Sequence, residues 1–432
     1  MNTSVKLLNL FFIFLAITSE ASSLNLSSAM DLFLKNSVQI KKLDADVQIT
    51  KLKEKNAINE FLPSLDLTAE YGYKDSSNST EANTTQSLLK LSLTQSLYDN
   101  GISFLQKKIA ELELKQAETN LEYEKNLLCY NLAKEYLQYS TFNKIKEVQE
   151  KQLSNFKIQH DFLNKKKGSE HPETLQFLAQ VKRFEYAQRI SDRIQSASNL
   201  NINNLLETTE KLDFLPIEVE NLNLTNESLS FNYQDHPKIK FLDIQNEINE
   251  LKNKMDQKIN APTLDITAGY NIQSNQFIDS NKTFEQQKTS DWFGMISLKY
   301  NLFDFGTNSN QAKINHLNYF KNQNQYEKEK KDIISEIEKV KSIYLKDYEN
   351  FKLAIQLIEV EKKNVNNIQN DYKFGKKEFV SLMWSLNGSA DSKIIFFNTA
   401  NDLLTSKFKW LTWQNKLCDQ LKNEESYLTD TK

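Results

Sequence analysis

Glycine and proline are rare in this chain, and their positions divide it into two halves built on the same plan. The 432 residues include only eight glycines and five prolines. Three of them in the first half have partners in the second at offsets of 199, 205 and 207 residues, namely Pro63 and Pro262, Gly101 and Gly306, and Gly168 and Gly375. Because the offsets are nearly constant, the sequence predicts two internal repeats of one structural unit.

After each of the two prolines, apolar residues alternate with polar ones, as in β-strands that have one apolar side. The predicted strands are 64–73, 88–97, 264–273 and 292–302, and polar loops are predicted between them at 74–86 and 274–290. The alternation weakens at Phe293 and Met295. Strands of about ten residues are long enough to cross a bilayer at a tilt. An amphipathic hairpin on a soluble core would give the same pattern.

A long stretch without glycine or proline follows each hairpin and carries apolar residues at steps of three and four. The seams are Leu128, Leu132, Tyr136, Tyr139, Phe142 and Ile145 in the first half, and Ile333, Ile337, Val340, Tyr344, Tyr348, Phe351, Ile355 and Ile358 in the second. This near-heptad spacing predicts coiled helices. A helix of about 60 residues spans about 90 Å, so it must pack on other long helices or stand as a rod. Gly168 and Gly375 are predicted to end these helices in tight turns.

The N-terminus has the pattern of a secretory signal peptide over residues 1–21. Lys6 precedes an apolar run that ends at Ile17, and Ser19-Glu-Ala21 forms a cleavage site of small residues. The run is too short for a membrane-spanning helix, and an uncleaved N-terminal anchor is the alternative. No other window of the sequence is apolar enough for such a helix, so we expect any membrane crossing to use β-strands.

Charge and side-chain chemistry narrow the classes of function. The formal net charge is −3, so nucleic acid is not an expected partner. The four histidines do not have metal-ligand spacing, and the sequence holds no nucleophile–base pair or phosphate-binding loop. We therefore expect neither catalysis nor a cofactor. Cys129 and Cys418 are predicted at similar heights along the helices, where either a disulfide or two buried thiols would fit.

Four short motifs, in this order and spacing, resemble those of the TolC-like outer-membrane efflux protein family. They are Phe61-Leu-Pro-Ser-Leu65, Leu97-Tyr-Asp-Asn-Gly101, Leu302-Phe-Asp-Phe-Gly306 and Tyr372-Lys-Phe-Gly375. The resemblance extends over nearly the whole mature chain. It implies a mixed fold in a homotrimer, in which each copy gives four strands to a shared transmembrane β-barrel and its long helices form a coiled-coil α-barrel across the periplasm.

The expected organisation follows from the repeats and the resemblance. The predicted segments are the signal peptide at 1–21, a first repeat at 22–207 with a hairpin at 64–97, a linker at 208–234, a second repeat at 235–421 with a hairpin at 264–302, and a tail at 422–432. The resemblance implies a passive exit duct in the outer membrane that serves an efflux pump or type I secretion system. Its partners would be a periplasmic adaptor, an inner-membrane transporter and outer-membrane lipid. A non-conducting periplasmic or surface coiled-coil structural protein is the alternative.

The candidate functional residues lie at the two ends of the repeats. Family position and local charge mark the turns as sites of adaptor docking or gating, with candidates Gly168, Glu170, Gly375, Lys376, Lys377 and Glu378. Ordinary solvated turn charges are the alternative. The strand alternation predicts that four apolar side chains face lipid, namely Leu67, Leu91, Ile266 and Leu298. Gly388 is expected to interrupt the last long helix.

Overall fold

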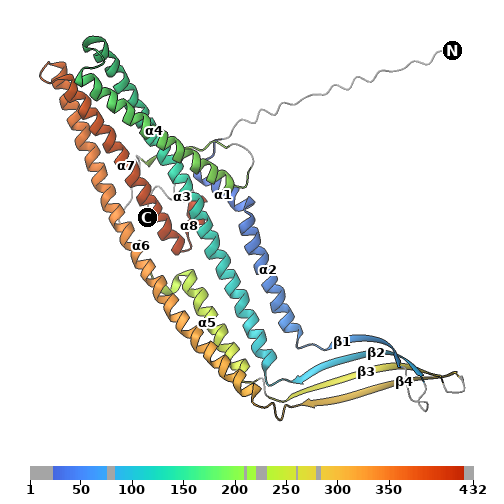
Figure 1. Cartoon of the computed structure of the whole chain (residues 1–432). Coiled ribbons are helices and arrows are strands. Elements are labelled where there is room, and N and C mark those ends of the chain that lie inside the picture. Colours follow the sequence, from blue (N-terminus) through green and yellow to red (C-terminus); the bar gives the residue numbers. More distant parts are fainter. Residues whose placement is uncertain are drawn as a thin grey trace, which may run out of the picture.

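In the computed structural model the chain is long and mostly helical, with one antiparallel sheet at one end and two turns that each connect a pair of helices at the other (Figure 1). The structure describes residues 23–74, 83–208, 212–219, 231–258, 261–278 and 284–422. No helix within these ranges is long and apolar enough to cross a membrane. The predicted signal peptide, much of the linker and nearly all of the tail lie outside the described residues.

The order of elements is the same in the two halves. The first half contains α1 (Leu26–Asn36), α2 (Val38–Asn59), β1 (Ser64–Lys74), β2 (Asn83–Tyr98), α3 (Ile102–Lys167) and α4 (Pro172–Leu205). After the short turn η2 (Tyr233–Asp235), the second half contains α5 (Pro237–Asp256), β3 (Thr263–Ile278), β4 (Phe284–Lys299), α6 (Thr307–Lys373), α7 (Phe379–Trp413) and α8 (Leu417–Lys422). Helix, hairpin, long helix and second long helix thus follow one another twice.

The strands extend farther from the helices than the alternation predicts. Strand β1 runs to Lys74 and β2 begins at Asn83, while β3 runs to Ile278 and β4 begins at Phe284. The loop predictions are therefore wrong at 74, 83–86, 274–278 and 284–290, while residues 75–82 and 279–283 lie outside the described part of the chain. In these parts the backbone ladder continues where apolar and polar residues no longer alternate, because backbone hydrogen bonds do not depend on that alternation. At its other end, β4 stops at Lys299 and not at 302.

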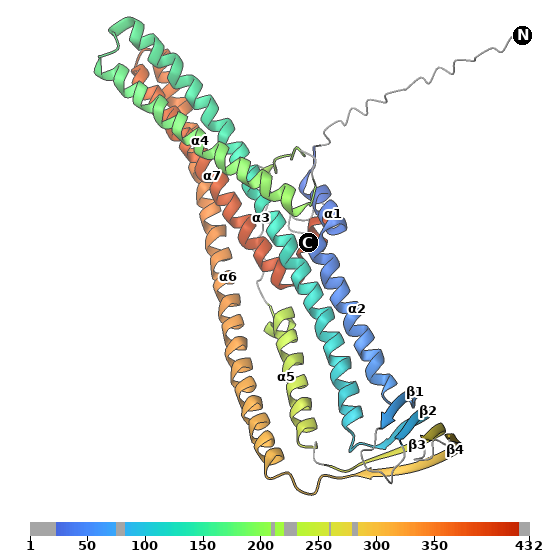
Figure 2. The ribbon, with the colours of Figure 1, turned by 45° about the vertical axis from the view of Figure 1, so that its right-hand side comes forward.

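The long helices lie side by side in a layer, which we call the wall (Figures 1 and 2). The set of helices that form this wall changes midway along the molecule. Near the sheet, α3 packs between α2 and α5, and α5 packs against α6. Farther along, α3 packs between α4 and α7, and α7 packs against α6. Helix α3 therefore lies in the interior of the wall along its full length.

The predicted seams supply much of the core. In α6, five seam residues are buried, namely Ile337, Val340, Tyr344, Tyr348 and Phe351. In α3, Leu132 and Tyr136 are completely buried. The Tyr136 hydroxyl lies 2.7 Å from the carbonyl oxygens of both Leu24 and Leu215, so it ties two connecting segments to α3.

Two local helix predictions were wrong. The apolar spacing that starts at Ala29, after a capping residue at Ser27, predicts one helix that continues to Ile58. Asn25 caps it instead by accepting a hydrogen bond from the Ser28 amide at 2.8 Å, and Ser37 divides it into α1 and α2. Helix α7 also continues through Gly388 without a break. A glycine within a helix costs only about 1 kcal/mol relative to alanine, which packing against neighbouring helices outweighs.

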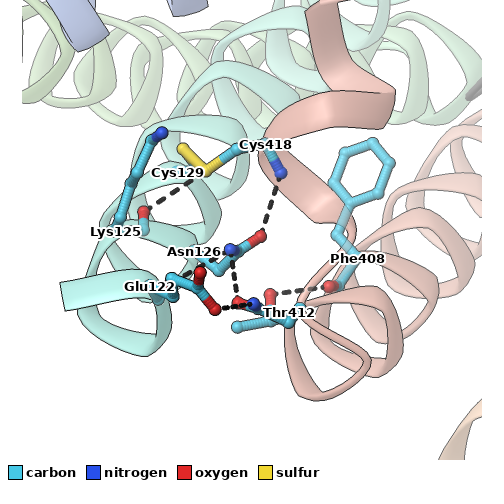
Figure 3. The surroundings of a disulfide bond; sticks show 8 residues. Glu122, Lys125, Asn126, Cys129, Phe408, Thr412 and Cys418 are labelled. Carbon is cyan, nitrogen blue, oxygen red and sulfur yellow. Dashed lines mark hydrogen bonds between the residues drawn. A yellow bond between two sulfur atoms is a disulfide. The ribbon is translucent and has the colours of Figure 1, made fainter. Parts of the chain in front are cut away.

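A disulfide joins Cys129 of α3 to Cys418 of α8, which answers the question left open by the sequence (Figure 3). Beside it, the Asn126 side chain accepts a hydrogen bond from the Cys418 amide at 3.1 Å and donates one to Asn415 at 2.7 Å. The Ser27 hydroxyl donates to the carbonyl oxygen of Lys422 at 2.6 Å. The short helix α8 thus fastens the C-terminal end of the described chain to both α3 and α1.

His236 lies directly before α5 in a cage of aromatic rings and is only 2% exposed. Its Nδ1 accepts a hydrogen bond from the Lys238 amide at 3.2 Å, and its ring centre lies 5.7 Å from that of Trp413. Burial, aided by the nearby charge of Lys238, lowers the pKa of His236 to about 4. The folded state therefore needs this imidazole neutral, since only an unprotonated Nδ1 can cap the helix.

We expect the free energy of unfolding to fall as the pH is lowered from about 6.5 to about 4. In this window the imidazole of the unfolded chain takes up a proton and the folded one does not, so this residue contributes a slope of at most about 1.4 kcal/mol per pH unit. His236→Asn retains a hydrogen-bond acceptor for the cap and should make the free energy of unfolding less dependent on pH in this window. Urea unfolding of the purified protein at several pH values in this window measures the change. The exposed His316→Asn is the control, and an equal flattening there would contradict the assignment.

Candidate functional site

The candidate functional regions are the sheet with its junctions to the helices and the two turns at the opposite end. Within the described part of the chain, no group of three or more histidine, cysteine or acidic residues is placed to hold a metal ion.

The same aspartate turn leads from each hairpin into a long helix. Asp99 Oδ1 accepts from the Gly101 amide at 2.9 Å, and its Oδ2 accepts from the Ser103 amide at 2.6 Å. Asp304 accepts from the amides two and four residues later at 3.0 and 2.8 Å. Each carboxylate thus satisfies amides that the first turn of a helix leaves unpaired. Burial acts to raise the pKa of Asp99, but hydrogen bonds from Ser103, Gly101 and Ile102 outweigh it and lower the pKa.

The register places the four predicted lipid-facing residues on one face of the sheet. The strand order is β1-β2-β3-β4, and paired residues in antiparallel strands point to the same side. Leu67 pairs with Leu91, which pairs with Tyr270, while Ile266 and Leu298 occupy the same face nearer the helices. Polar residues such as Thr94 and Thr267, whose hydroxyl oxygens lie 3.3 Å apart, occupy the other face. We refer to these as the apolar face and the polar face.

The first turn, between α3 and α4, ends one helix and caps the next. Gly168 terminates α3, and its amide donates to the Asn164 carbonyl oxygen at 3.0 Å. His171 caps α4 by accepting from the Glu173 amide at 3.3 Å. The Lys167 ammonium lies 2.7 Å from the Glu173 carboxylate, and this hydrogen bond lowers the pKa of Glu173. Glu170 is exposed.

The second turn, between α6 and α7, is a Schellman motif. The Gly375 amide donates to the Tyr372 carbonyl oxygen at 3.0 Å, and the Lys376 amide donates to that of Asp371 at 2.8 Å. Gly375 has φ of +71°, a left-handed conformation that favours glycine. Among the described residues, no ion pair joins the exposed side chains of Lys376, Lys377 and Glu378 to one another or to the first turn. The structure therefore presents these charges to solvent at the end of the molecule.

Aromatic side chains that the sequence analysis did not select connect the two turns. Phe379, at the start of α7, stacks on Phe177 of α4 at 6.5 Å between ring centres and lies 5.7 Å from the ring of Tyr372. Phe177 continues the contact to Phe156 of α3 at 5.7 Å. The two turns therefore form one packed unit. Their aromatic residues could have been noted in the sequence, but nothing local indicated that they meet.

Comparisons with known proteins agree with this architecture. The family model for outer membrane efflux proteins matches residues 29–164. The structure is similar to the CmeC outer membrane channel of Campylobacter jejuni, with a TM-score of 0.75 and 12% identity over 94% of this chain and 90% of that one. It is also similar to the open-state MtrE outer membrane channel of Neisseria gonorrhoeae, with a TM-score of 0.75 and 13% identity over 91% of this chain and 90% of that one.

A third similar structure is the outer membrane protein VceC of Vibrio cholerae, with a TM-score of 0.71 and 14% identity over 90% of this chain and 96% of that one. A comparison with curated protein sequences found no match. The resemblance to the outer-membrane efflux proteins that the four motifs predict is confirmed by the family model over residues 29–164. The solved structures extend it, as a likeness of fold, over most of the chain.

Gly375 and Gly388 should respond to substitution by alanine in opposite directions. Gly375→Ala forces a side chain into a left-handed backbone, so we expect a loss of roughly 1–2 kcal/mol in the free energy of unfolding. Gly388→Ala should add roughly 0.5–1 kcal/mol to the free energy of unfolding, because Gly388 is helical and the atom nearest to a new methyl group would be a carboxylate oxygen of Glu361 at 3.4 Å. Urea unfolding measures both. A change of the same sign in the two variants would contradict these backbone assignments.

Proposed function

We propose that this chain, which matches the outer membrane efflux protein family over residues 29–164 and has the fold of its channels, forms a homotrimeric exit duct in the outer membrane. The duct would conduct passively and extend into the periplasm. It would serve an efflux pump or a type I secretion system, with an inner-membrane transporter as the source of energy and a periplasmic adaptor as the link.

The observation that carries the proposal is a sheet with two open edges. Strands β1 and β4 are the outer members of the order β1-β2-β3-β4, and no described strand pairs with their outer sides. Unpaired backbone groups cost several kcal/mol each in lipid, so an open sheet cannot remain in a membrane alone. Three copies that pair β4 of one with β1 of the next would close a barrel of twelve strands and leave no edge.

The exposed side chains fit this assembly on both the sheet and the helices. On the apolar face, Leu67 and Leu298 are about two-thirds exposed at 68% and 70%, as expected for residues that would contact lipid. Helices α2 and α6 lie at the two edges of the wall near the sheet and also expose apolar side chains, including Leu52 at 59% and Phe320 at 61%. We propose that these helical edges meet between neighbouring copies.

The proposed role involves no catalysis and no cofactor. The alternative function is a non-conducting periplasmic or surface coiled-coil protein. Outer-membrane fractionation separates the two, because a barrel would resist extraction from the membrane and a coiled-coil rod would not. Single-channel recording in planar bilayers and mass measurement of the detergent-extracted protein then test the duct directly. A folded monomer that forms no channel would overturn the proposal.

Ile266→Arg should reduce the yield of outer-membrane trimer more than Thr267→Arg. The two positions are adjacent in β3 but lie on the apolar and polar faces. A charge on a lipid-facing position near mid-bilayer costs about 2–4 kcal/mol, whereas a position in a water-filled lumen tolerates it. Comparing trimer in the outer-membrane fraction measures the difference. If Thr267→Arg were the more damaging, the two faces would have been assigned the wrong way round.

We further propose that the two turns dock the adaptor and that their charges influence the entrance. The candidates are those named from the sequence, namely Gly168, Glu170, Gly375, Lys376, Lys377 and Glu378. Their location at the exposed end of one packed unit supports this role, since docking there could move both turns together.

Lys377→Glu would place a second negative charge beside Glu378 and should loosen contacts at the entrance, with a higher single-channel conductance as the expected result. Glu378→Lys is the matched reversal. Conductance is measured in planar bilayers and pump-dependent export in cells. If neither variant changed either measurement, the turn charges would be ordinary solvated charges, each pair worth about 0–1 kcal/mol.

A further inference from the structure

The polar face of the sheet carries an aromatic residue where the alternation of β4 weakens. Phe293 points to the same side as Thr267 and Ser92, opposite to its neighbour Trp292. The other residues of this face are small or polar apart from Leu88 and Met295, among the strand residues whose side chains are described. If the polar face lines a lumen, as the proposed function requires, Phe293 is an apolar ring inside a polar duct.

The Phe293 ring packs directly against the backbone of Gly269 in β3, where there is no side chain. These residues pair across β3 and β4, and a Cβ atom added to Gly269 would lie 2.6 Å from the ring Cζ and 2.4 Å from the Leu91 carbonyl oxygen. A glycine inside a strand often marks such a close approach. The ring therefore lies across β3 and does not project straight out from the wall. Ser92, the partner of Gly269 on β2, is only 8% exposed.

A lysine from a third strand completes the group. The Lys90 ammonium of β2 lies 5.2 Å from the centre of the Phe293 ring, within the range of a cation–π contact. Asp291 lies in the same row of the sheet as Lys90, two strands away. The ring thus has a positive charge within the distance of a cation–π contact.

The remaining charges of the polar face are mainly negative. The carboxylates are those of Asp66, Glu70, Asp265 and Asp291, and the only other described lysine side chain of the strands on this face is that of Lys299. The polar face as a whole therefore contributes little favourable binding free energy to a simple anion. An anion that also carries an apolar ring would bind more favourably beside Phe293, because its ring would contact Phe293 while its charge contacts Lys90.

We propose that Phe293 and Lys90, positioned by Gly269, form a binding patch for permeating organic anions that carry an aromatic ring. This inference rests on the proposed function. With three copies around one lumen, three such patches would lie at the same depth. A barrel of twelve strands is narrow enough for wall residues to influence what passes, since eight strands leave space only for side chains and sixteen leave an open channel.

Current block in planar bilayers tests the patch, with 2-naphthoate as the probe and acetate as the anion without a ring. In wild-type channels 2-naphthoate should reduce single-channel current at concentrations where acetate does not. Phe293→Ser and Lys90→Gln should each raise the half-blocking concentration by about fivefold. Met295→Ser is the control, since Met295 is an exposed apolar residue of the same face that lies opposite Thr267 and not over a glycine.

Phe293→Leu guards against a folding defect, because it keeps apolar bulk without a ring and should weaken the block as Phe293→Ser does. Equal block by acetate and 2-naphthoate would overturn the inference and leave the duct intact. So would an equal loss of block in Met295→Ser. If the wild-type protein formed no channels at all, the proposed function would fail, and the patch would fail with it.

Discussion

The packing of other elements against α3 is the interaction on which the rest of the structure depends. This helix contacts α2 and α5 near the sheet, α1 and α8 midway, and α4 and α7 toward the turns. Most helical stability in proteins comes from tertiary packing, so a helix of 66 residues needs such contacts along its whole length. The disulfide at Cys129 and the hydrogen bonds of Asn126 lie where the helices around α3 change. The disulfide and these hydrogen bonds stabilise the wall at the level where α4 and α7 replace α2 and α5 as the neighbours of α3.

Features with a local cause could be predicted from the sequence. The motifs that end at Gly101 and Gly306 were noted in the sequence, but capping by Asp99 and Asp304 was not predicted, although its cause is local because carboxylate, glycine and helix start lie within five residues. The long helices were predicted because glycine and proline are absent and the apolar seam persists. The side of each strand was also predictable, since a period of two fixes the faces once the strand is recognised.

Features with a distant cause could not be predicted. Cys129 and Cys418 pair because α8 folds back onto α3 across 289 residues of sequence, which no local pattern reveals. Phe379 joins the two turns for the same reason. The outer ends of β2, β3 and β4 were missed because the alternation of apolar and polar residues stops there, although the backbone ladder continues. Gly388 was misjudged because its helical propensity was considered without the neighbouring helices that hold α7 straight.

Because each long helix packs mainly against its neighbours in the wall, the fold can be shared with solved structures that are only 12–14% identical to this chain. Each helix must bury only the stripes that contact its neighbours, and many side chains of comparable volume fill such stripes. The positions that cannot vary freely are those where the backbone itself is constrained. Gly375 requires a left-handed conformation, and Gly269 leaves no space for a Cβ atom beneath Phe293. A few such positions, in the correct order and spacing, constrain the architecture more tightly than the individual side chains of the helical stripes do.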